Sequence, residues 1–327
     1  MKPRVLFHIP RQRHTDFQSY KHLKLLVVLK EVLERHGVVV ELAHLHGPYQ
    51  TAKARSWPLT HFDDGNLHIL PNTGLNHPAI LNFALAYVDP YWHFSPEGSL
   101  AFSPIGARSY EPQEFGFAVA MPFFRKLRRK WVLKRKSRYG RAEEKDHIPE
   151  NCISIFLQGE FPHISGVANM SNEMMVREVL KGAGEHPVVI KQHPLVNGLK
   201  DMKMVQKLQD EGYVFHISEA NVHDIVAKSA ATVSFNSSVA LEGMMQWTPA
   251  ILFGKSDFHH AAQTVEKEGE FAAALARAKV AFPRYKKYLY WYFNQCLDLD
   301  AEDAETQLLA VLENHGWPLS RLTGSGG

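Results

Sequence analysis

Short apolar runs alternate with segments of helical periodicity through the C-terminal half of the chain. Between the runs, apolar residues recur every three or four positions. The expected strands are residues 152–157, 188–191, 213–217, 231–235 and 250–253, and the expected helices are residues 171–182, 199–211, 222–228 and 239–246. This alternation is typical of a parallel sheet covered by helices. We therefore predict one α/β domain over residues 150–270.

The N-terminal half repeats the plan less clearly. The pattern predicts strands at residues 4–9, 38–42 and 67–70 and helices at residues 20–35 and 78–87, whereas residues 90–122 receive no assignment. Residues 271–316 read as mostly helical, with a break at Pro283. We predict a first α/β domain over residues 1–145 and a C-terminal helical segment and tail over residues 271–327. The fold class is α/β, with two sheet domains that face each other across a cleft and C-terminal helices that return to the first domain.

Composition places the chain among folded globular proteins. Of its 327 residues 45% are hydrophobic and 22% are charged, and the formal net charge is only +3. No window reaches the roughly 18 uninterrupted apolar residues of a membrane span, and the N-terminus lacks the pattern of a signal peptide. The two cysteines, Cys152 and Cys296, imply no disulfide framework. We therefore expect a cytoplasmic protein.

A polar motif closes the apolar run at residues 188–191. Lys191 ends the run, and Gln192, His193 and Pro194 follow. Proline ends sheet pairing because it has no amide hydrogen, so His193 is expected at the carboxyl edge of the sheet, where α/β proteins bind ligands. An imidazole there can bind a phosphate oxygen and stabilise a departing nucleotide. Bonding to a backbone carbonyl is an equally weighted structural interpretation.

A second polar motif lies between the next strand and helix. Asn236, Ser237 and Ser238 occupy the start of the helix, where serine is a favoured cap and where hydroxyls and free N–H groups also hold anions. Capping is favoured on this motif alone. Because we place the two motifs on neighbouring strands, we expect His193 and both serines to converge on one phosphate. Glu219 follows another strand, and it either accepts the ribose hydroxyls or complements a helix dipole.

Other enzyme classes lack their signatures. Gly254-Lys255-Ser256 is not a phosphate loop, and the chain has no Gly-x-Gly-x-x-Gly, Gly-x-Ser-x-Gly or His-Glu-x-x-His motif. The 19 histidines are scattered and the cysteines lack ligand spacing. We therefore expect neither a metal site nor a resident cofactor, and no divalent metal requirement is evident.

The ordered motifs resemble known families. The Lys-Gln-His-Pro motif at residues 191–194, the acidic residue at 219 and the serine pair at 237–238 resemble the nucleotide-binding pattern of CMP-sugar transferases. Residues 236–245, with the Thr-Pro-Ala-Ile-Leu-Phe-Gly segment at 248–254, look like the bacterial capsule polysaccharide biosynthesis and export family, whose members include β-Kdo transferases. The resemblance covers residues 153–258, and it implies a GT-B fold of two Rossmann-like domains and a CMP-sugar donor.

The resemblance also implies roles for individual residues. Backbone near Lys191 would face cytosine, Glu219 would hold the ribose, and His193, Ser237 and Ser238 would hold the phosphate. A Gln-containing strand-end motif of the Kdo enzymes matches Gln158-Gly-Glu160, but the catalytic aspartate that should follow it is absent here.

Glu160 is the carboxylate closest to the position of that missing aspartate. We take it as the candidate nucleophile or base. A structural cap or ion pair is an equally weighted interpretation, and the stereochemical course stays open.

Two basic segments suggest further partners. In the loop after the first expected strand, His8, Arg11, Arg13 and His14 form a candidate site for an anionic acceptor, although surface loops are often basic. From Arg125 to Arg141 the chain carries ten basic residues in an expected helix. Such a segment can dock on an anionic membrane surface, and a solvated helix face is the common alternative. No nucleic-acid-binding module accompanies it, so nucleic acid is not an expected partner.

These observations predict a glycosyltransferase that moves a sugar, such as Kdo or a related acidic sugar from a CMP donor, onto a capsular or surface glycan or glycolipid. Two alternatives remain open. One is a transferase or epimerase that uses a UDP-sugar or CDP-glycerol. The other is a non-catalytic partner in capsule assembly or export, which the missing aspartate favours. The expected location is cytoplasmic, with possible attachment at the inner face of the membrane.

Overall fold

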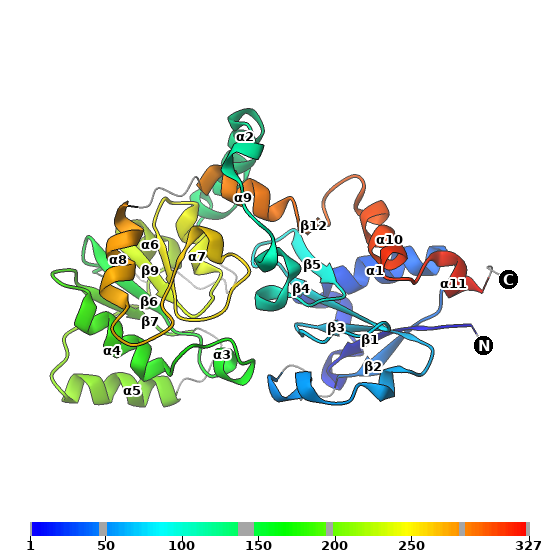
Figure 1. Cartoon of the computed structure of the whole chain (residues 1–327), viewed down its shortest axis with the longest axis horizontal. Helices are drawn as coiled ribbons and strands as arrows, with labels where there is room; N and C mark the ends of the chain where they lie inside the picture. Colours follow the sequence, from blue (N-terminus) through cyan, green and yellow to red (C-terminus); the bar gives the residue numbers. More distant parts are fainter. Residues whose placement is uncertain (1, 46–50, 137–146, 194–198, 281–284, 325–327) are drawn as a thin grey trace. The chain divides into compact units, whose positions relative to one another are not determined.

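The computed structural model describes residues 2–45, 51–136, 147–193, 199–280 and 285–324 (Figure 1). The chain forms two compact units. The first comprises residues 1–108 and 293–327, and the second comprises residues 109–292. Each unit is built on a six-stranded sheet. The two parallel-sheet, Rossmann-like units confirm the predicted α/β fold class.

The first unit has strand order β12-β5-β4-β3-β1-β2. The strands are β1 (Val5–Ile9), β2 (Val40–His44), β3 (Leu67–Pro71), β4 (Ile80–Leu85), β5 (Tyr91–Ser95) and β12 (Leu297–Asp298). Strands β1 to β4 pair in parallel, whereas β5 and β12 pair antiparallel with their neighbours. Helix α1 (Lys24–Arg35) connects β1 to β2.

The helix predicted at residues 78–87 is wrong, because this segment contains strand β4. Residues 80–84 are all buried, so the strand carries apolar side chains on both faces of the sheet. A strand covered on both faces reads as a continuous apolar run, and periodicity does not distinguish such a run from a buried helix.

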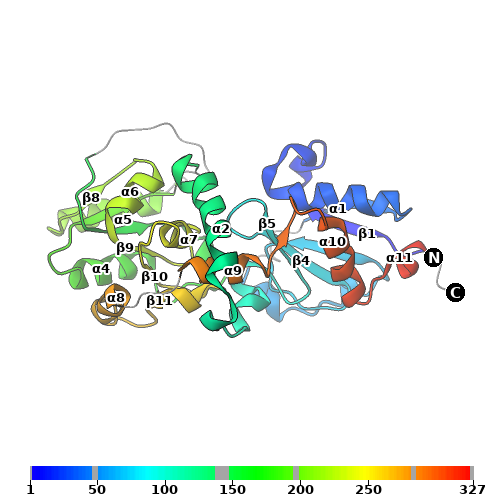
Figure 2. The same ribbon diagram turned by 90° about the horizontal axis from the view of Figure 1, so that it is seen from above.

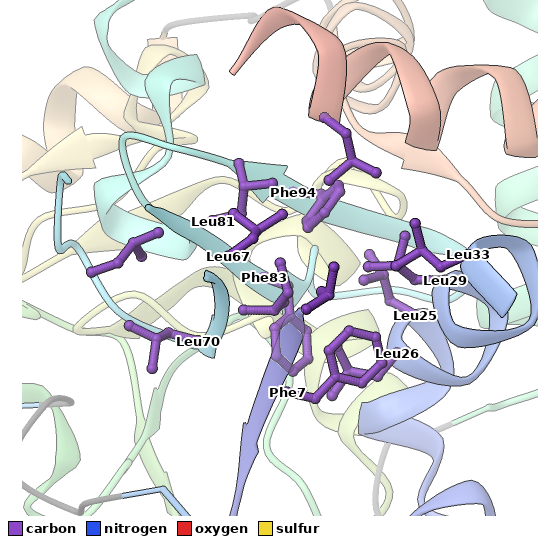
Figure 3. Packing of buried hydrophobic residues seen from close by; sticks show 14 of the residues in the cluster. Phe7, Leu25, Leu26, Leu29, Leu33, Leu67, Leu70, Leu81, Phe83 and Phe94 are labelled. Carbon is purple, nitrogen blue, oxygen red and sulfur yellow. The ribbon is translucent and has the colours of Figure 1, made fainter. Parts of the chain in front are cut away.

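The core of the first unit forms between its sheet and its helices. Phe7 of β1 and Phe83 of β4 pack with Leu26 and Leu29 of α1 (Figure 3). The C-terminal helices α10 (Ala304–Asn314) and α11 (Leu319–Thr323) belong to this unit, and Leu308 and Leu312 of α10 extend the same core. Figures 1 and 2 show α10 beside α1.

The second unit has an entirely parallel sheet of order β11-β10-β9-β6-β7-β8. Its strands are β6 (Cys152–Phe156), β7 (Val188–Lys191), β8 (His216–Ile217), β9 (Ser229–Ser234), β10 (Ala250–Leu252) and β11 (Gln263–Thr264). The predicted alternation over residues 150–270 is confirmed here, with shifts of a few residues at the ends of elements.

Helices cover both faces of this sheet. The helices of this unit are α2 (Phe117–Arg128), α3 (Phe161–Ile164), α4 (Asn172–Gly182), α5 (Leu199–Asp210), α6 (Val222–Lys228), α7 (Val239–Met244), α8 (Phe271–Val280) and α9 (Tyr285–Phe293), whose last residue is assigned to the first unit. One apolar cluster joins the sheet to α4, α5 and α8, and another joins its opposite face to α6 and α7. Successive residues of β6 point to opposite faces of the sheet and so belong to different clusters. Ile155 belongs to the cluster with α4, α5 and α8, and Phe156 belongs to the cluster with α6 and α7.

The division into units differs from the predicted boundaries at residues 145, 150 and 270. Helix α2 belongs with the second unit, where Phe124 packs against Trp247 with ring centroids 5.4 Å apart. Helices α2 and α9 lie side by side in Figures 1 and 2, and Phe123 contacts Tyr290. Within the described parts of the chain, every helix is too short or too polar to span a lipid bilayer.

Candidate functional site

The strand order of the second unit creates a switch point between β6 and β9. From β6 the chain runs outward through β7 to β8, and it then returns to β9 and continues to β10 and β11 on the other side. In open parallel sheets, ligands bind in the crevice at the carboxyl ends of the strands where this order reverses. The loops after β6, β7 and β9 therefore define the candidate site.

Gln158 joins the carboxyl ends of β6 and β9. Its Oε1 accepts hydrogen bonds from the backbone amides of Phe235 and Asn236, each at 3.0 Å. Its Nε2 donates to Oδ1 of Asn236 at 3.1 Å. Asn236 in turn donates through Nδ2 to the carbonyl of Lys255 at 3.1 Å, after β10. This network fixes the loop after β9 relative to both neighbouring strands.

Two glycines allow the loops at this edge to come close together. Gly159 has φ of 62°, which turns the chain sharply after Gln158. A Cβ on Gly254 would lie 2.6 Å from the carbonyl oxygen of Val167 and 3.3 Å from that of Phe235. The loop that follows α3 therefore packs directly on the ends of β9 and β10.

The serine turn after β9 has both the predicted structural role and the predicted location. Ser237 Oγ accepts a hydrogen bond from the amide of Val239 at 3.3 Å, so it caps the start of α7. Ser238 Oγ donates to Oε1 of the buried Glu242 at 3.2 Å. Asn236 and both serines are half-buried. The hydroxyl groups thus lie at the carboxyl edge of the sheet in a turn held by the network of Gln158.

The Lys-Gln-His-Pro motif lies at the carboxyl end of β7. Lys191 is the last residue of the strand, and its carbonyl accepts the amide of Leu157 at 3.0 Å. His193 follows two residues later and is half-buried. Pro194 lies outside the described residues. His193 therefore lies at the carboxyl edge of the sheet, where the sequence predicted it.

β7 and β9 are not neighbouring strands, because β6 lies between them. This corrects the sequence-based placement of the two motifs. Two strand spacings separate the ends of β7 and β9 by about 10 Å. His193 and the serine turn thus flank Gln158 from either side. Such a separation suits a ligand that spans the switch point, such as a nucleotide with its phosphate.

Glu219 lies beyond the carboxyl end of β8, next to β7. The preceding residue, Ser218, is buried, and its amide donates to the carbonyl of Ile190 at 3.0 Å. Glu219 itself is half-buried. The fold therefore places Glu219 on the same edge of the sheet as His193, one strand farther from the switch point.

Glu160 sits in the turn between β6 and α3. Its Oε2 lies 3.0 Å from Nζ of Lys200, and the two side chains are 47% and 78% exposed. An exposed ion pair of this kind contributes little to stability. It fits the structural interpretation of Glu160, and it places the carboxylate beside a cation and in contact with solvent.

Sequence reasoning gave no role to His163, Asn172 or Asp201, which form a hydrogen-bonded chain beside this turn. His163 Nε2 lies 2.8 Å from Oδ1 of Asn172, whose Nδ2 donates to Oδ1 of Asp201 at 2.8 Å and to the carbonyl of Gly159 at 3.3 Å. The imidazole also packs edge-on against Phe235, with ring centroids 5.1 Å apart. The only sequence signal was a histidine five residues after Gln158.

Asp201 is a buried carboxyl group, with 4% of its surface exposed. Burial raises its pKa, the Asn172 hydrogen bond acts in the opposite direction, and the nearby Glu160 charge adds to the rise. Raised carboxyl pKa values cluster at functional sites as well as in structural networks. Asp201 therefore marks the turn after β6 as an electrostatically unusual part of the sheet edge.

The basic loop of the first unit holds its side chains mostly against itself. Arg13 contacts His22 and lies over the ring of Tyr20, and His14 Nε2 is 3.0 Å from the carbonyl of Ile9. Arg11 is exposed. The acceptor role predicted for this loop stays a prediction, with Arg11 as its most accessible cation.

His8 lies inside the first unit. It is 8% exposed, and its Nε2 is 2.9 Å from Nδ1 of His68, whose Nε2 is 3.0 Å from Oδ1 of Asp64. His68 pairs in register with Leu6, and residues two apart on a strand share a face, so the two imidazoles lie on one face of the sheet. The His8 side chain is therefore buried over one face of the sheet, which differs from the loop-edge position that its predicted acceptor role requires.

Among the residues that the structure describes, no three His, Cys, Asp or Glu side chains are grouped as metal ligands. The candidate site instead offers an imidazole, hydroxyls, amides and a carboxylate. Imidazole N–H, hydroxyl and amide groups are hydrogen-bond donors of the kind that can hold phosphate oxygens, and a carboxylate can accept hydrogen bonds from hydroxyl groups.

The site lies in the part of the chain that matches a known family. The family model described as capsule polysaccharide biosynthesis protein matches residues 155–288. A search of curated proteins gave no match.

Three solved structures are similar to the chain. The β-Kdo 2,7 transferase KpsC of Thermosulfurimonas dismutans has a TM-score of 0.53 at 11% identity, over 96% of this chain and 99% of that chain. The β-Kdo 2,4 transferase KpsC of the same organism has a TM-score of 0.49 at 12% identity, over 87% and 88%. UDP-GlcNAc 2-epimerase from Methanocaldococcus jannaschii has a TM-score of 0.36 at 10% identity, over 89% and 98%.

At 11% identity, the likeness to the 2,7 transferase establishes the fold alone. The other two likenesses, with lower TM-scores, carry no argument. The family match covers the strand-end loops after β6, β7 and β9. Residues 155–288 therefore belong to the capsule polysaccharide biosynthesis family, within a chain that has the fold of a β-Kdo transferase.

Proposed function

We propose that the chain is a glycosyltransferase that moves a sugar from a nucleotide donor to a capsular or surface glycan. The donor we propose is a CMP-activated acidic sugar, Kdo or a relative of it. The observation that carries this proposal is the meeting of three polar loops at the switch point of a parallel sheet, inside the segment that matches the capsule family. The solved structure with a similar fold is that of a β-Kdo 2,7 transferase, and this supports the choice of sugar.

The proposed roles follow from position. His193 and the hydroxyls of Ser237 and Ser238 bind the phosphate from the two sides of β6. Glu219, one strand beyond β7, accepts the ribose hydroxyls. Transfer breaks the bond between the sugar and the phosphate, so donors aimed at the phosphate stabilise the negative charge that develops on the departing CMP.

The donor class is tested with a thermal-shift panel of CMP, UMP, CDP and UDP. A ligand at 100 times its dissociation constant adds about 2.7 kcal/mol to the stability of the protein that binds it. We expect the largest shift with CMP. A larger shift with UDP supports the UDP-sugar alternative, and a larger shift with CDP supports the CDP-glycerol alternative, and either result contradicts our proposal.

His186 provides a matched control for His193. His186 lies two residues before β7, at the amino edge of the sheet, whereas His193 lies two residues after it. We expect His193→Ala to lower turnover by about 10²-fold, because it removes a donor to developing charge, and His186→Ala to leave turnover unchanged. A chain that binds CMP but turns over no CMP-sugar with any acceptor would instead be a non-catalytic capsule partner.

We propose further that α2 and the π-helical turn after it (Arg129–Leu133) dock on anionic lipid. Ala120, Phe124 and Trp131 point into the unit. The opposite side exposes Val119 at 48% and Leu133 at 69%. A groove on this segment is lined by Pro122 and Leu133 together with six cations, Arg125, Lys126, Arg128, Arg129, Lys130 and Lys134. Interleaved cations and apolar side chains are the pattern of an interfacial helix.

Vesicle flotation tests this docking surface. The triple variant Lys126→Glu, Arg129→Glu, Lys130→Glu should bind phosphatidylglycerol vesicles at least 100-fold more weakly, since each cation near the surface contributes about 1 kcal/mol. The matched control reverses three exposed lysines elsewhere in the unit, with the variants Lys181→Glu, Lys203→Glu and Lys267→Glu. Equal loss in both triple variants would mean that only net charge matters.

A further inference from the structure

A buried path of polar groups leads from the serine turn into the interior of the second unit. Ser238 Oγ donates to Oε1 of Glu242 on α7 at 3.2 Å. The other carboxylate oxygen of Glu242, Oε2, lies 3.8 Å from Nε2 of His223 on the neighbouring helix α6 (Figures 1 and 2). Glu242 and His223 are 4% and 3% exposed. The path therefore runs from a proposed phosphate ligand to a buried imidazole.

The same imidazole also holds the end of the segment proposed to dock on lipid. Nε2 of His223 lies 3.0 Å from the carbonyl oxygen of Lys136, three residues after the π-helical turn. Beside it, the guanidinium of Arg135 binds both carboxylate oxygens of Asp224, with Nη2 at 2.7 Å from Oδ2. All of these residues belong to the second unit. The bond from His223 to Lys136 is thus one of the anchors that hold the docking segment on α6.

The partners of His223 fix which ring nitrogen carries the proton. A backbone carbonyl only accepts hydrogen bonds, so Nε2 is the donor toward Lys136. Nδ1 lies 3.3 Å from the amide nitrogen of Gln246, which only donates, so Nδ1 is the acceptor. The single Nε2–H group therefore has two acceptors near it, the Lys136 carbonyl at 3.0 Å and the Glu242 carboxylate at 3.8 Å. In the structure it bonds to the carbonyl.

The hydroxyl of Ser238 has a similar choice of partner. A serine has one O–H group to donate, and here it is directed at Glu242. A phosphate oxygen is an acceptor, so Ser238 has to turn its hydrogen away from Glu242 in order to bind one. Loss of a donor from a buried carboxylate costs free energy. The Nε2–H group of His223 replaces that donor when it turns from the carbonyl to the carboxylate.

We propose that Ser238, Glu242 and His223 form a hydrogen-bond relay that couples the phosphate site to the end of the docking segment; this inference rests on the proposed function and on the proposed lipid docking. In the arrangement that the structure shows, Ser238 donates to Glu242 and His223 donates to Lys136. In the arrangement that bound phosphate favours, Ser238 donates to the phosphate, His223 donates to Glu242, and the carbonyl of Lys136 is released. An element with two discrete arrangements is what coupling between two sites requires.

Release of the Lys136 carbonyl weakens lipid docking. A segment that is held at its end presents its cations and apolar side chains in a fixed geometry, and loss of an anchor adds to the ordering cost of docking. One hydrogen bond changes such an equilibrium by about 2- to 10-fold. Bound CMP should therefore weaken binding to phosphatidylglycerol vesicles by this factor. Because linkage is reciprocal, the vesicles should weaken CMP binding equally.

The variant Ser238→Ala tests the relay without any nucleotide. It removes the donor to Glu242, so His223 should turn to the carboxylate and release Lys136. The amides of Arg135 and Lys136 close the turn at the end of the segment, where they donate to backbone carbonyls at 2.9 and 2.8 Å. Their hydrogen exchange should be about 2- to 10-fold faster than in the unaltered protein. Ser238→Thr keeps the hydroxyl and should keep the slow exchange.

Ser237→Ala is the matched control. Ser237 is the other serine proposed to bind the phosphate, but its Oγ accepts the backbone amide of Val239 at 3.3 Å. This variant should bind CMP more weakly and leave the exchange of the amides of Arg135 and Lys136 unchanged. Saturating CMP should then accelerate these two amides in the unaltered protein and in Ser237→Ala. In Ser238→Ala, where the relay has already switched, CMP should add nothing.

The outcomes separate this inference from the proposals on which it rests. Equal exchange of the two amides in Ser238→Ala and in the unaltered protein would overturn the relay, with or without nucleotide. CMP that binds in calorimetry but leaves both this exchange and vesicle affinity unchanged would overturn the coupling alone. Absence of CMP binding or of vesicle binding by the unaltered protein would refute the proposed donor or the proposed docking, and the coupling with it.

Discussion

Replacing Gln158 tests the network that holds the candidate site. In Gln158→Leu the two hydrogen bonds to the amides of Phe235 and Asn236 and the bond to Asn236 Oδ1 are lost. A buried amide left without a partner costs about 1–3 kcal/mol, and Asn236 is half-buried, so water compensates part of its loss. We therefore expect the free energy of unfolding to fall by about 2–4 kcal/mol.

Gln158→Glu is the matched variant that separates stability from binding. The carboxylate still accepts both amide hydrogen bonds and loses only the bond to Asn236, so the free energy of unfolding should fall by about 1 kcal/mol. A negative charge roughly 8 Å from a bound phosphate, at an effective dielectric constant of about 20, costs about 2 kcal/mol. The affinity for CMP should then fall by about 30-fold.

Urea unfolding and CMP titration by calorimetry measure the two quantities independently. We expect Gln158→Leu to lose much of its free energy of unfolding. We expect Gln158→Glu to lose little of that free energy but much of its affinity for CMP. Equal stability of Gln158→Leu and the unaltered protein would refute the role of the network. Unchanged CMP affinity in Gln158→Glu would place the phosphate away from the switch point.

Two further predictions concern packing and pH. Gly254→Ala should lower the free energy of unfolding by about 1–3 kcal/mol in urea unfolding, because the new Cβ meets the carbonyl of Val167 at 2.6 Å; an unchanged value would contradict the close approach. For Asp64, partial burial would raise the pKa, but hydrogen bonds from Asn66 and His68 lower it from 3.8 to about 2. Its stabilising effect is therefore present above pH 3.8 and lost as the pH falls toward 2, so Asp64→Asn should show a smaller drop in Tm over that range, and an equal drop would count against it.

The sequence was sufficient to predict the second unit because its elements are locally specified. Val188–Lys191 and Val222–Lys228 have the predicted bounds, since each is marked by a periodic pattern and by residues that end the element. The same reasoning did not identify strand β4, because burial on both faces removes the alternation of apolar and polar residues that identifies a strand.

The candidate site was predicted in its parts but not in its arrangement. Placing Lys191, His193 and Ser237 at strand ends required only local patterns. That β6 lies between β7 and β9 depends on pairing between residues more than 70 positions apart, which no local pattern encodes. The hydrogen-bonded chain of His163, Asn172 and Asp201 joins three helices that are distant in sequence. No local pattern encodes this contact either.

The central claim is that CMP binds at the carboxyl ends of β6, β7 and β9. Hydrogen–deuterium exchange with and without saturating CMP tests it directly. Binding at this edge should slow amide exchange in residues 157–164, 191–193 and 235–242, while residues 149–152 and 185–188 at the opposite edge of the same sheet should exchange as before. Protection confined to the opposite edge or to the first unit, or no protection at all, would contradict the account.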